Sequence, residues 1–214
     1  MLASAAGASA VVETSLLFIS VLLTLGAYGE YYRDTAAAAI QPNRWSWLIW
    51  SAGTGMEVAT FQGVSGDFAT TSVFVGSAVA CCFITALIWR RGSWQPASAT
   101  ELACVAATVL ALVAWFAFQD YWWAHVIMLA AIPISFLPTY RSAWQNPARE
   151  ASPSWMLWTL GDLFALAYVL MRYDSARELP YAIIEAIAHA GVWFVLLRRR
   201  GPTRALGAAQ SVGP

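Results

Sequence analysis

Four ionisable side chains stand inside long apolar runs of the sequence, where a charge is costly. They are Glu57, Asp162, Glu185 and His189. An ionised group at the centre of a lipid bilayer costs roughly 2.5–3.5 kcal/mol, so such residues usually face the interior of a helix bundle and mark a pathway. We therefore expect these side chains to bind a solute or to carry a proton.

Glu185 and His189 are four residues apart and share one face of a predicted helix. A carboxylate beside the imidazole would stabilise its protonated form. The pair is therefore expected to couple a proton or to complete a binding site. The alternative is an interhelical hydrogen-bond clamp through which nothing passes.

Two predicted helix faces each carry a pair of tryptophans followed by polar residues at helical spacing. Indole faces stack on flat rings and attract cations, so a solute could be held between them. The predicted substrate-binding residues are Trp50, Trp158, Asp162, Glu57, Thr54, Trp47 and Trp155. For the two outer indoles, Trp47 and Trp155, an aromatic belt at the membrane–water interface is the alternative.

The two tryptophan pairs belong to an internal repeat. Residues 46–53 read SWLIWSAG and residues 154–161 read SWMLWTLG, at an offset of 108 residues. The same offset relates Tyr32-Arg33 to Tyr140-Arg141. The repeat predicts two similar halves, which differ where Asp162 replaces Thr54.

The composition is that of a membrane protein. Hydrophobic residues make up 59% of the chain and charged residues only 11%, whereas soluble domains carry about 25% charged residues. The net charge is zero, which argues against nucleic-acid binding through an overall basic field. A covalently bound retinal requires an intramembrane lysine, and the chain contains none. We expect no cofactor, no metal site and no catalytic nucleophile, because no residue spacing indicates one.

Seven apolar runs are long enough to cross a bilayer, which takes about 20 residues. They cover residues 11–29, 46–63, 68–89, 101–118, 121–140, 154–171 and 179–197. With the repeat, they predict an all-α membrane protein of seven transmembrane helices in a parallel 3+1+3 arrangement. The predicted segments are a 1–10 N-terminal extension, a first three-helix repeat over 11–92, a linker helix over 93–120, a second repeat over 121–200 and a disordered tail over 201–214.

Arginine placement predicts the orientation. Ten of the twelve arginines fall in the connections that follow runs one, three and five and in the C-terminal segment. Positively charged loops stay in the cytoplasm. We therefore expect the N-terminus outside and the C-terminus in the cytoplasm, in a bacterial inner membrane.

Residues 136–141, which read FLPTYR, together with the later segment 154–162 resemble the PQ-loop pattern. The wider superfamily includes SWEET sugar transporters and Pnu-type vitamin transporters. The latter carry paired tryptophans at the start of a transmembrane helix, a spacing that Trp47/Trp50 and Trp155/Trp158 match. The resemblance implies a small-solute transporter with 3+1+3 helices.

Together these features predict a transporter that moves a small polar or aromatic solute by alternating access, at a midplane site between the two repeats. Its expected partners are that solute and membrane lipid, and a homo-oligomer is compatible with the sequence. One alternative is a membrane-embedded enzyme that uses the Glu/Asp/His cluster. Another is an accessory membrane subunit without transport. A transporter would place the tryptophan pairs and Asp162 around a shared cavity.

Overall fold

The structure, a computed structural model, describes residues 2–65, 68–91, 96–118, 121–172 and 179–198. This part of the chain contains α-helices, one short 3₁₀ helix and no strand, which confirms the predicted all-α fold. The α-helices are α1 (Leu2–Ala36), α2 (Arg44–Ser65), α3 (Phe68–Arg91), α4 (Ala99–Phe118), α5 (Tyr121–Gln145), α6 (Ser154–Arg172) and α7 (Leu179–Arg198). The 3₁₀ helix, η1 (Pro147–Arg149), lies between α5 and α6.

Six of these helices are long and apolar enough to cross a lipid bilayer, judged over the described residues: α1, α3, α4, α5, α6 and α7. Their outward-facing side chains include large apolar groups such as Phe83, Leu110 and Phe194. Extended apolar surface of this kind suits contact with lipid and is unfavourable in water. The helices and their surfaces therefore support an integral membrane protein.

Helix α2 is the one that falls short of the hydropathy expected for a membrane span. It begins at Arg44, carries Glu57 near its middle and contains several small or polar residues. It packs against α3, α4 and α5. Its polar side chains are therefore covered by neighbouring helices, and its apolar content need not match that of a lipid-exposed helix.

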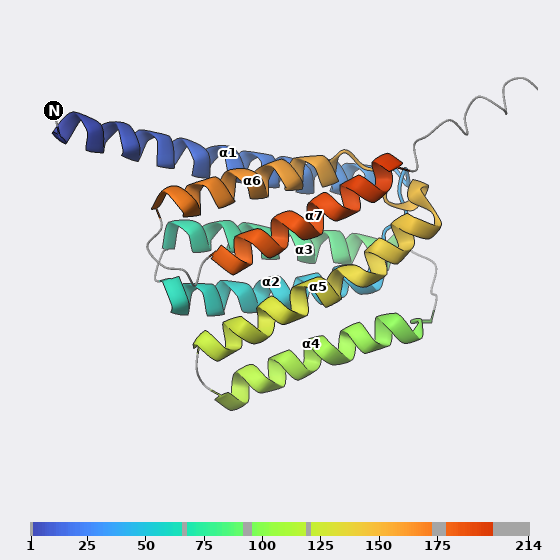
Figure 1. Cartoon of the computed structure of the whole chain (residues 1–214). Coiled ribbons are helices and arrows are strands. Elements are labelled where there is room, and N and C mark those ends of the chain that lie inside the picture. Colours follow the sequence, from blue (N-terminus) through green and yellow to red (C-terminus); the bar gives the residue numbers. More distant parts are fainter. Residues whose placement is uncertain (1, 66–67, 92–95, 119–120, 173–178, 199–214) are drawn as a thin grey trace, which may run out of the picture.

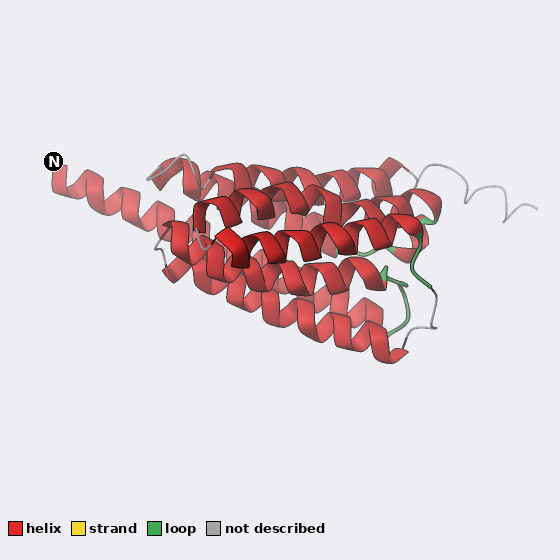
Figure 2. Cartoon of the chain, turned by 90° about the horizontal axis from the view of Figure 1, so that it is seen from below, coloured by secondary structure: helices red, strands yellow, loops and turns green. Residues whose placement is uncertain are grey.

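Each of the seven predicted runs lies within one helix, but the first helix is longer than predicted. Residues 2–10, expected as a separate extension, continue into α1, and this end of the helix projects beyond the bundle (Figures 1 and 2). The segment is rich in alanine, the strongest helix former. The predicted disordered tail at 201–214 lies outside the described residues.

The helices run side by side along a common direction (Figure 1). Helix α1 packs on α6, and α2 packs on α5. Helix α3 packs on α1 and α2, while α7 packs on α5 and α6. Helix α4 lies against α2 and α5 at one edge of the bundle. The helices of the N-terminal and C-terminal segments are thus interleaved rather than separate.

Candidate functional site

A cavity at the centre of the bundle is lined by residues from all seven α-helices, and we call it the central cavity. Its volume is about 150 Å³. All nine residues singled out by the sequence line it, namely Trp47, Trp50, Thr54, Glu57, Trp155, Trp158, Asp162, Glu185 and His189. The fold therefore brings together side chains that are up to 142 positions apart, from Trp47 to His189.

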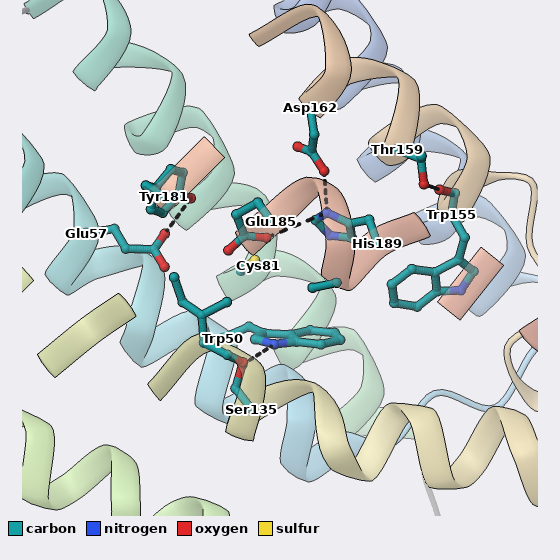
Figure 3. A network of polar contacts seen from close by, with 12 residues as sticks. Trp50, Glu57, Cys81, Ser135, Trp155, Thr159, Asp162, Tyr181, Glu185 and His189 are labelled. Carbon is teal, nitrogen blue, oxygen red and sulfur yellow. Dashed lines mark hydrogen bonds and ion pairs between the residues drawn. The ribbon is translucent and has the colours of Figure 1, made fainter. Parts of the chain in front are cut away.

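One part of the cavity wall carries an imidazole and two carboxylates (Figure 3). The Nδ1 atom of His189 lies 2.7 Å from Oδ2 of Asp162, within hydrogen-bond distance. It lies 3.6 Å from Oε2 of Glu185, the partner expected from the sequence. His189 is therefore hydrogen-bonded across the α6–α7 interface, and Glu185 is a second, more distant carboxylate beside the same nitrogen.

The third carboxylate of the cavity lies on another helix and has a different partner. The Tyr181 hydroxyl of α7 donates a hydrogen bond of 3.2 Å to Oε2 of Glu57 on α2 (Figure 3). The sequence did not single out Tyr181, because a tyrosine near the start of an apolar helix is also what an interfacial belt would contain. The bond links α2 directly to α7.

Four indoles form the aromatic part of the wall. The ring centroids are 5.2 Å apart within each pair, Trp47–Trp50 and Trp155–Trp158. The pairs also contact each other, with Trp47 and Trp158 6.3 Å apart and Trp50 and Trp155 6.2 Å apart. Trp47 is 2% exposed and Trp155 is fully buried. These two residues therefore lie inside the bundle and not in a lipid-facing aromatic belt.

The indoles also contact the ionisable groups. The imidazole of His189 stacks on Trp158 at a centroid distance of 5.5 Å and an interplanar angle of 20°. Phe136 of α5 meets the same imidazole edge-on at 5.2 Å. The position of the His189 ring is thus set by aromatic contacts from two helices and by the hydrogen bond to Asp162.

Positions related by the 108-residue offset line the central cavity with side chains of different chemistry. Asp162, Glu185 and His189 stand in the second half of the chain where Thr54, Ser77 and Cys81 stand in the first. All six residues line the central cavity. At these three positions the first half therefore supplies neutral polar groups, and the second half supplies two carboxylates and an imidazole. Ser77 and Cys81 were not predicted, because neither residue type is costly in an apolar helix.

The tryptophans show the same asymmetry. Nε1 of Trp50 donates a hydrogen bond of 2.9 Å to the Ser135 hydroxyl of α5 (Figure 3). The residue equivalent to Trp50 is Trp158, and the residue equivalent to Ser135 is Ala27, which has no acceptor in its side chain. Nε1 of Trp158 is buried without a hydrogen-bond partner among the described residues, and so is Nε1 of Trp155.

A hydrogen-bonded chain leads from the cavity wall to the segment before α6. Nε1 of Trp47 donates to the Tyr31 hydroxyl at 3.3 Å, and this hydroxyl donates to Oε2 of Glu150 at 2.6 Å. The backbone N–H of Asn43 donates to Oε1 of Glu150 at 3.3 Å. Glu150 is 1% exposed and lies outside the apolar helices.

Burial raises the pKa of Glu150 to about 7, although its two hydrogen bonds and the nearby Arg149 act in the opposite direction. A buried carboxyl that loses its proton near neutral pH joins α1, the start of α2 and the segment before α6. Glu150 was not predicted as a site residue, since a glutamate in a polar connection is normally solvated.

Within the described residues, no three His, Cys, Asp or Glu side chains are grouped as a metal site would require. Comparison of the chain with protein-family models, curated proteins and solved structures found no match. The functional interpretation therefore rests on the geometry of the site.

Proposed function

We propose that the protein is an integral membrane transporter that moves a small polar or aromatic solute by alternating access. The observation that carries the proposal is the central cavity, where both tryptophan pairs and Asp162 surround one space. A purely structural subunit would have no need of three carboxyl groups and an imidazole around a cavity inside an apolar bundle, because their burial is costly.

The proposed architecture is a seven-span 3+1+3 arrangement similar to that of PQ-loop proteins. The packing pairs support it. Exchanging α1, α2 and α3 with α5, α6 and α7 converts the α1–α6 contact into α5–α2, α2–α3 into α6–α7, and α1–α3 into α5–α7. Every one of these contacts is present, and only α4 has no counterpart. In this arrangement α2 also crosses the membrane and, together with the six more apolar helices, gives seven spans.

The neighbours of the repeated glycine also support the two-half architecture. A Cβ atom at Gly161 of α6 would lie 2.8 Å from Oγ1 of Thr24 and 3.3 Å from the carbonyl oxygen of Ser20 on α1. At the equivalent Gly53 of α2, the nearest atom is the terminal methyl of Met128 on α5, at 3.7 Å. Met128 stands 108 residues after Ser20, so the same faces meet in both halves.

The proposed orientation places the N-terminus outside and the C-terminus in the cytoplasm of a bacterial inner membrane. The ends of α1, α3 and α5 then lie on the cytoplasmic side with Arg33, Arg91 and Arg141. Arginine-rich connections on that side follow the rule that positively charged loops are retained in the cytoplasm.

The cavity limits the size of the solute. A space of about 150 Å³ matches the volume of a cavity that holds a benzene-sized molecule. We propose that Trp50 and Trp158 stack against a small ring or apolar face of the solute. Asp162, Glu57 and Thr54 would bind its polar groups, and Trp47 and Trp155 would close the aromatic wall.

Glu185 and His189 have a separate proposed role. His189 is hydrogen-bonded to Asp162 and has Glu185 as a second carboxylate within 3.6 Å. A proton on this group could therefore be exchanged between the imidazole and either acid as the solute binds or leaves. Proton-coupled transport and facilitated diffusion differ in whether uptake follows an imposed pH gradient.

The experiment is a thermal-shift screen of the purified protein against vitamins, nucleosides, sugars and amines, followed by uptake assays with each solute that binds. A ligand that binds only the folded state raises the unfolding temperature.

We predict that Asp162→Asn weakens binding and uptake about tenfold or more, because a charge-assisted contact is lost. Glu30→Gln removes a carboxylate outside the cavity and should leave both unchanged. Unchanged uptake by Asp162→Asn at limiting and saturating solute would contradict the site.

A membrane-embedded enzyme is the second candidate, and the Asp162–His189 hydrogen bond favours it. An acid that orients an imidazole is a common arrangement for a general base. The two proposals separate experimentally, because an enzyme converts the solute in detergent solution, whereas a transporter returns it unchanged.

A further inference from the structure

A second cavity lies at the end of the bundle where α3 and α5 end and where α2 and α4 begin. Its volume is about 640 Å³, and it shares no lining residue with the central cavity. Four arginines and one carboxylate line it, namely Arg44, Arg91, Arg141, Arg149 and Glu101. We call this cavity the arginine pocket. Its lining carries an excess of three positive charges.

The one carboxylate of the arginine pocket is held by other groups. Glu101 accepts a hydrogen bond from Nδ2 of Asn43 and another from the backbone N–H of Ser98. Two of the four arginines donate to neutral acceptors: Arg141 donates to the Thr100 hydroxyl at 3.0 Å, and Arg91 donates to a backbone carbonyl oxygen of α1. Most of the positive charge around the pocket is therefore not neutralised by the carboxylate that lines it.

Arg33, the repeat counterpart of Arg141, has a different environment, so the excess positive charge of the arginine pocket is not a feature of both halves. Arg33 stands 108 residues before Arg141 and does not line the pocket. It is ion-paired with Glu30 and Asp34 on its own helix. The same repeat position thus holds a neutralised arginine in the first half and a pocket-lining arginine in the second.

We propose that the arginine pocket binds a phosphate-bearing anion. A planar guanidinium group pairs with phosphate through two parallel hydrogen bonds, and several such groups surround one space. The positive ends of the α2 and α4 helix dipoles also point to this end of the bundle. A volume of about 640 Å³ fits a phosphate group with its substituent, such as a diphosphate or an anionic lipid headgroup.

The two sources of phosphate, lipid and solution, can be told apart with the full-length protein in nanodiscs. One arm compares phosphatidylglycerol discs with phosphatidylcholine discs, and the other titrates inorganic pyrophosphate into phosphatidylcholine discs. Tryptophan fluorescence reports the unfolding temperature, which a bound anion raises. We expect the wild-type protein to respond in one arm and Arg141→Gln/Arg149→Gln to lose that response, with an apparent affinity about tenfold weaker or worse.

The matched control is Arg33→Gln/Arg198→Gln, which removes two exposed positive charges outside the pocket. It should keep the wild-type response.

A response to pyrophosphate assigns a soluble phosphate compound, and a response to phosphatidylglycerol alone assigns a lipid headgroup. No response in either arm, or an equal loss in the control, overturns the proposal. Arg141→Gln alone provides the same comparison with Arg33→Gln if the double variant does not fold. Because the two cavities are separate, this result is independent of solute binding in the central cavity.

Discussion

Single residues distinguish the two halves of the chain. The frame of tryptophan and glycine is repeated, whereas Thr54, Ser77 and Cys81 are replaced by Asp162, Glu185 and His189. The three replacements come together in space, since both carboxylates lie beside the His189 imidazole. An imidazole in this position would be hard to keep charged without an acid beside it. We interpret the three residues as one functional unit.

Glu150 yields a prediction about pH. Its pKa is about 7 in the folded protein, against 4.5 for an exposed glutamate. Below pH 4.5 it is protonated in both the folded and the unfolded state, so it does not affect stability. As the pH rises from 4.5 to 7, the unfolded state loses the proton first and becomes more favoured, and above pH 7 both states are ionised and the effect levels off. The folded state should therefore lose up to roughly 3 kcal/mol, at about 1.4 kcal/mol per pKa unit.

The variant Glu150→Gln stays neutral and should lack this loss. We expect its unfolding temperature in detergent to fall less between pH 5 and about 8 than that of the wild type. Glu30→Gln alters a partly exposed carboxylate and should follow the wild-type profile. Parallel pH profiles for Glu150→Gln and the wild type would contradict the assignment of Glu150 as a buried titrating group.

At the scale of helices, the closest approach in the repeated frame is between α1 and α6. Gly161 allows this approach, because any larger residue would meet Thr24 and the backbone of Ser20. Helices in membranes associate without a hydrophobic driving force, because lipid tails are as apolar as the side chains. They depend instead on close van der Waals packing, which small residues of this kind allow. Close packing therefore explains the glycine at position 161, whereas at Gly53 an added Cβ atom would make only an ordinary contact with Met128 at 3.7 Å.

We predict that Gly161→Ala lowers the unfolding temperature, by an amount corresponding to about 1–3 kcal/mol, because the added methyl group forces the helices apart. Gly26→Ala and Gly55→Ala are matched controls, because a Cβ atom at either position meets nothing within 4 Å. Alanine is the better helix former, so the controls should be as stable as the wild type or slightly more stable. Equal effects at all three positions would show that the α1–α6 approach is not tight.

The repeat can be tested with the unpartnered indole. If the two halves are equivalent, a serine at position 27 should face Trp158 as Ser135 faces Trp50, where the bond is 2.9 Å long. Ala27→Ser should then satisfy Nε1 of Trp158 and raise the stability by about 1 kcal/mol. Ser135→Ala should lower it by removing the partner of Trp50. A loss of stability in Ala27→Ser as large as that in Ser135→Ala would argue against equivalent environments at the two positions.

At the scale of the whole molecule, two features of the sequence were the most informative: the long apolar runs, and the ionisable residues whose burial inside those runs is energetically costly. Apolar runs predicted the seven helices, and ionisable residues such as Asp162 pointed to the lining of the central cavity. Glu150 was missed because only the fold shows that the chain before α6 folds back over Tyr31. The arginine pocket was missed for the same reason, since it forms only where separate connections and helix ends meet. The partner of His189 was predicted within its own helix, whereas the contact from α6 is shorter.

Transport by alternating access requires the central cavity to open to water, and Cys81 provides a built-in probe of this opening. Cys81 lines the central cavity, while the adjacent Cys82 is exposed on the outer surface of the bundle. In Cys82→Ser/Cys104→Ser, Cys81 is the only thiol left, and in Cys81→Ser/Cys104→Ser it is Cys82. Each protein is treated in membrane vesicles with a charged, membrane-impermeant methanethiosulfonate reagent, and labelling is measured against the denatured protein.

We predict that Cys81 is modified, that a transported solute slows its modification, and that the lipid-facing Cys82 reacts poorly. If the Cys81 thiol stays unmodified from both sides of the membrane, and Ser77→Cys in a cysteine-free background is equally unreactive, the central cavity does not open to water and the proposed transport is contradicted.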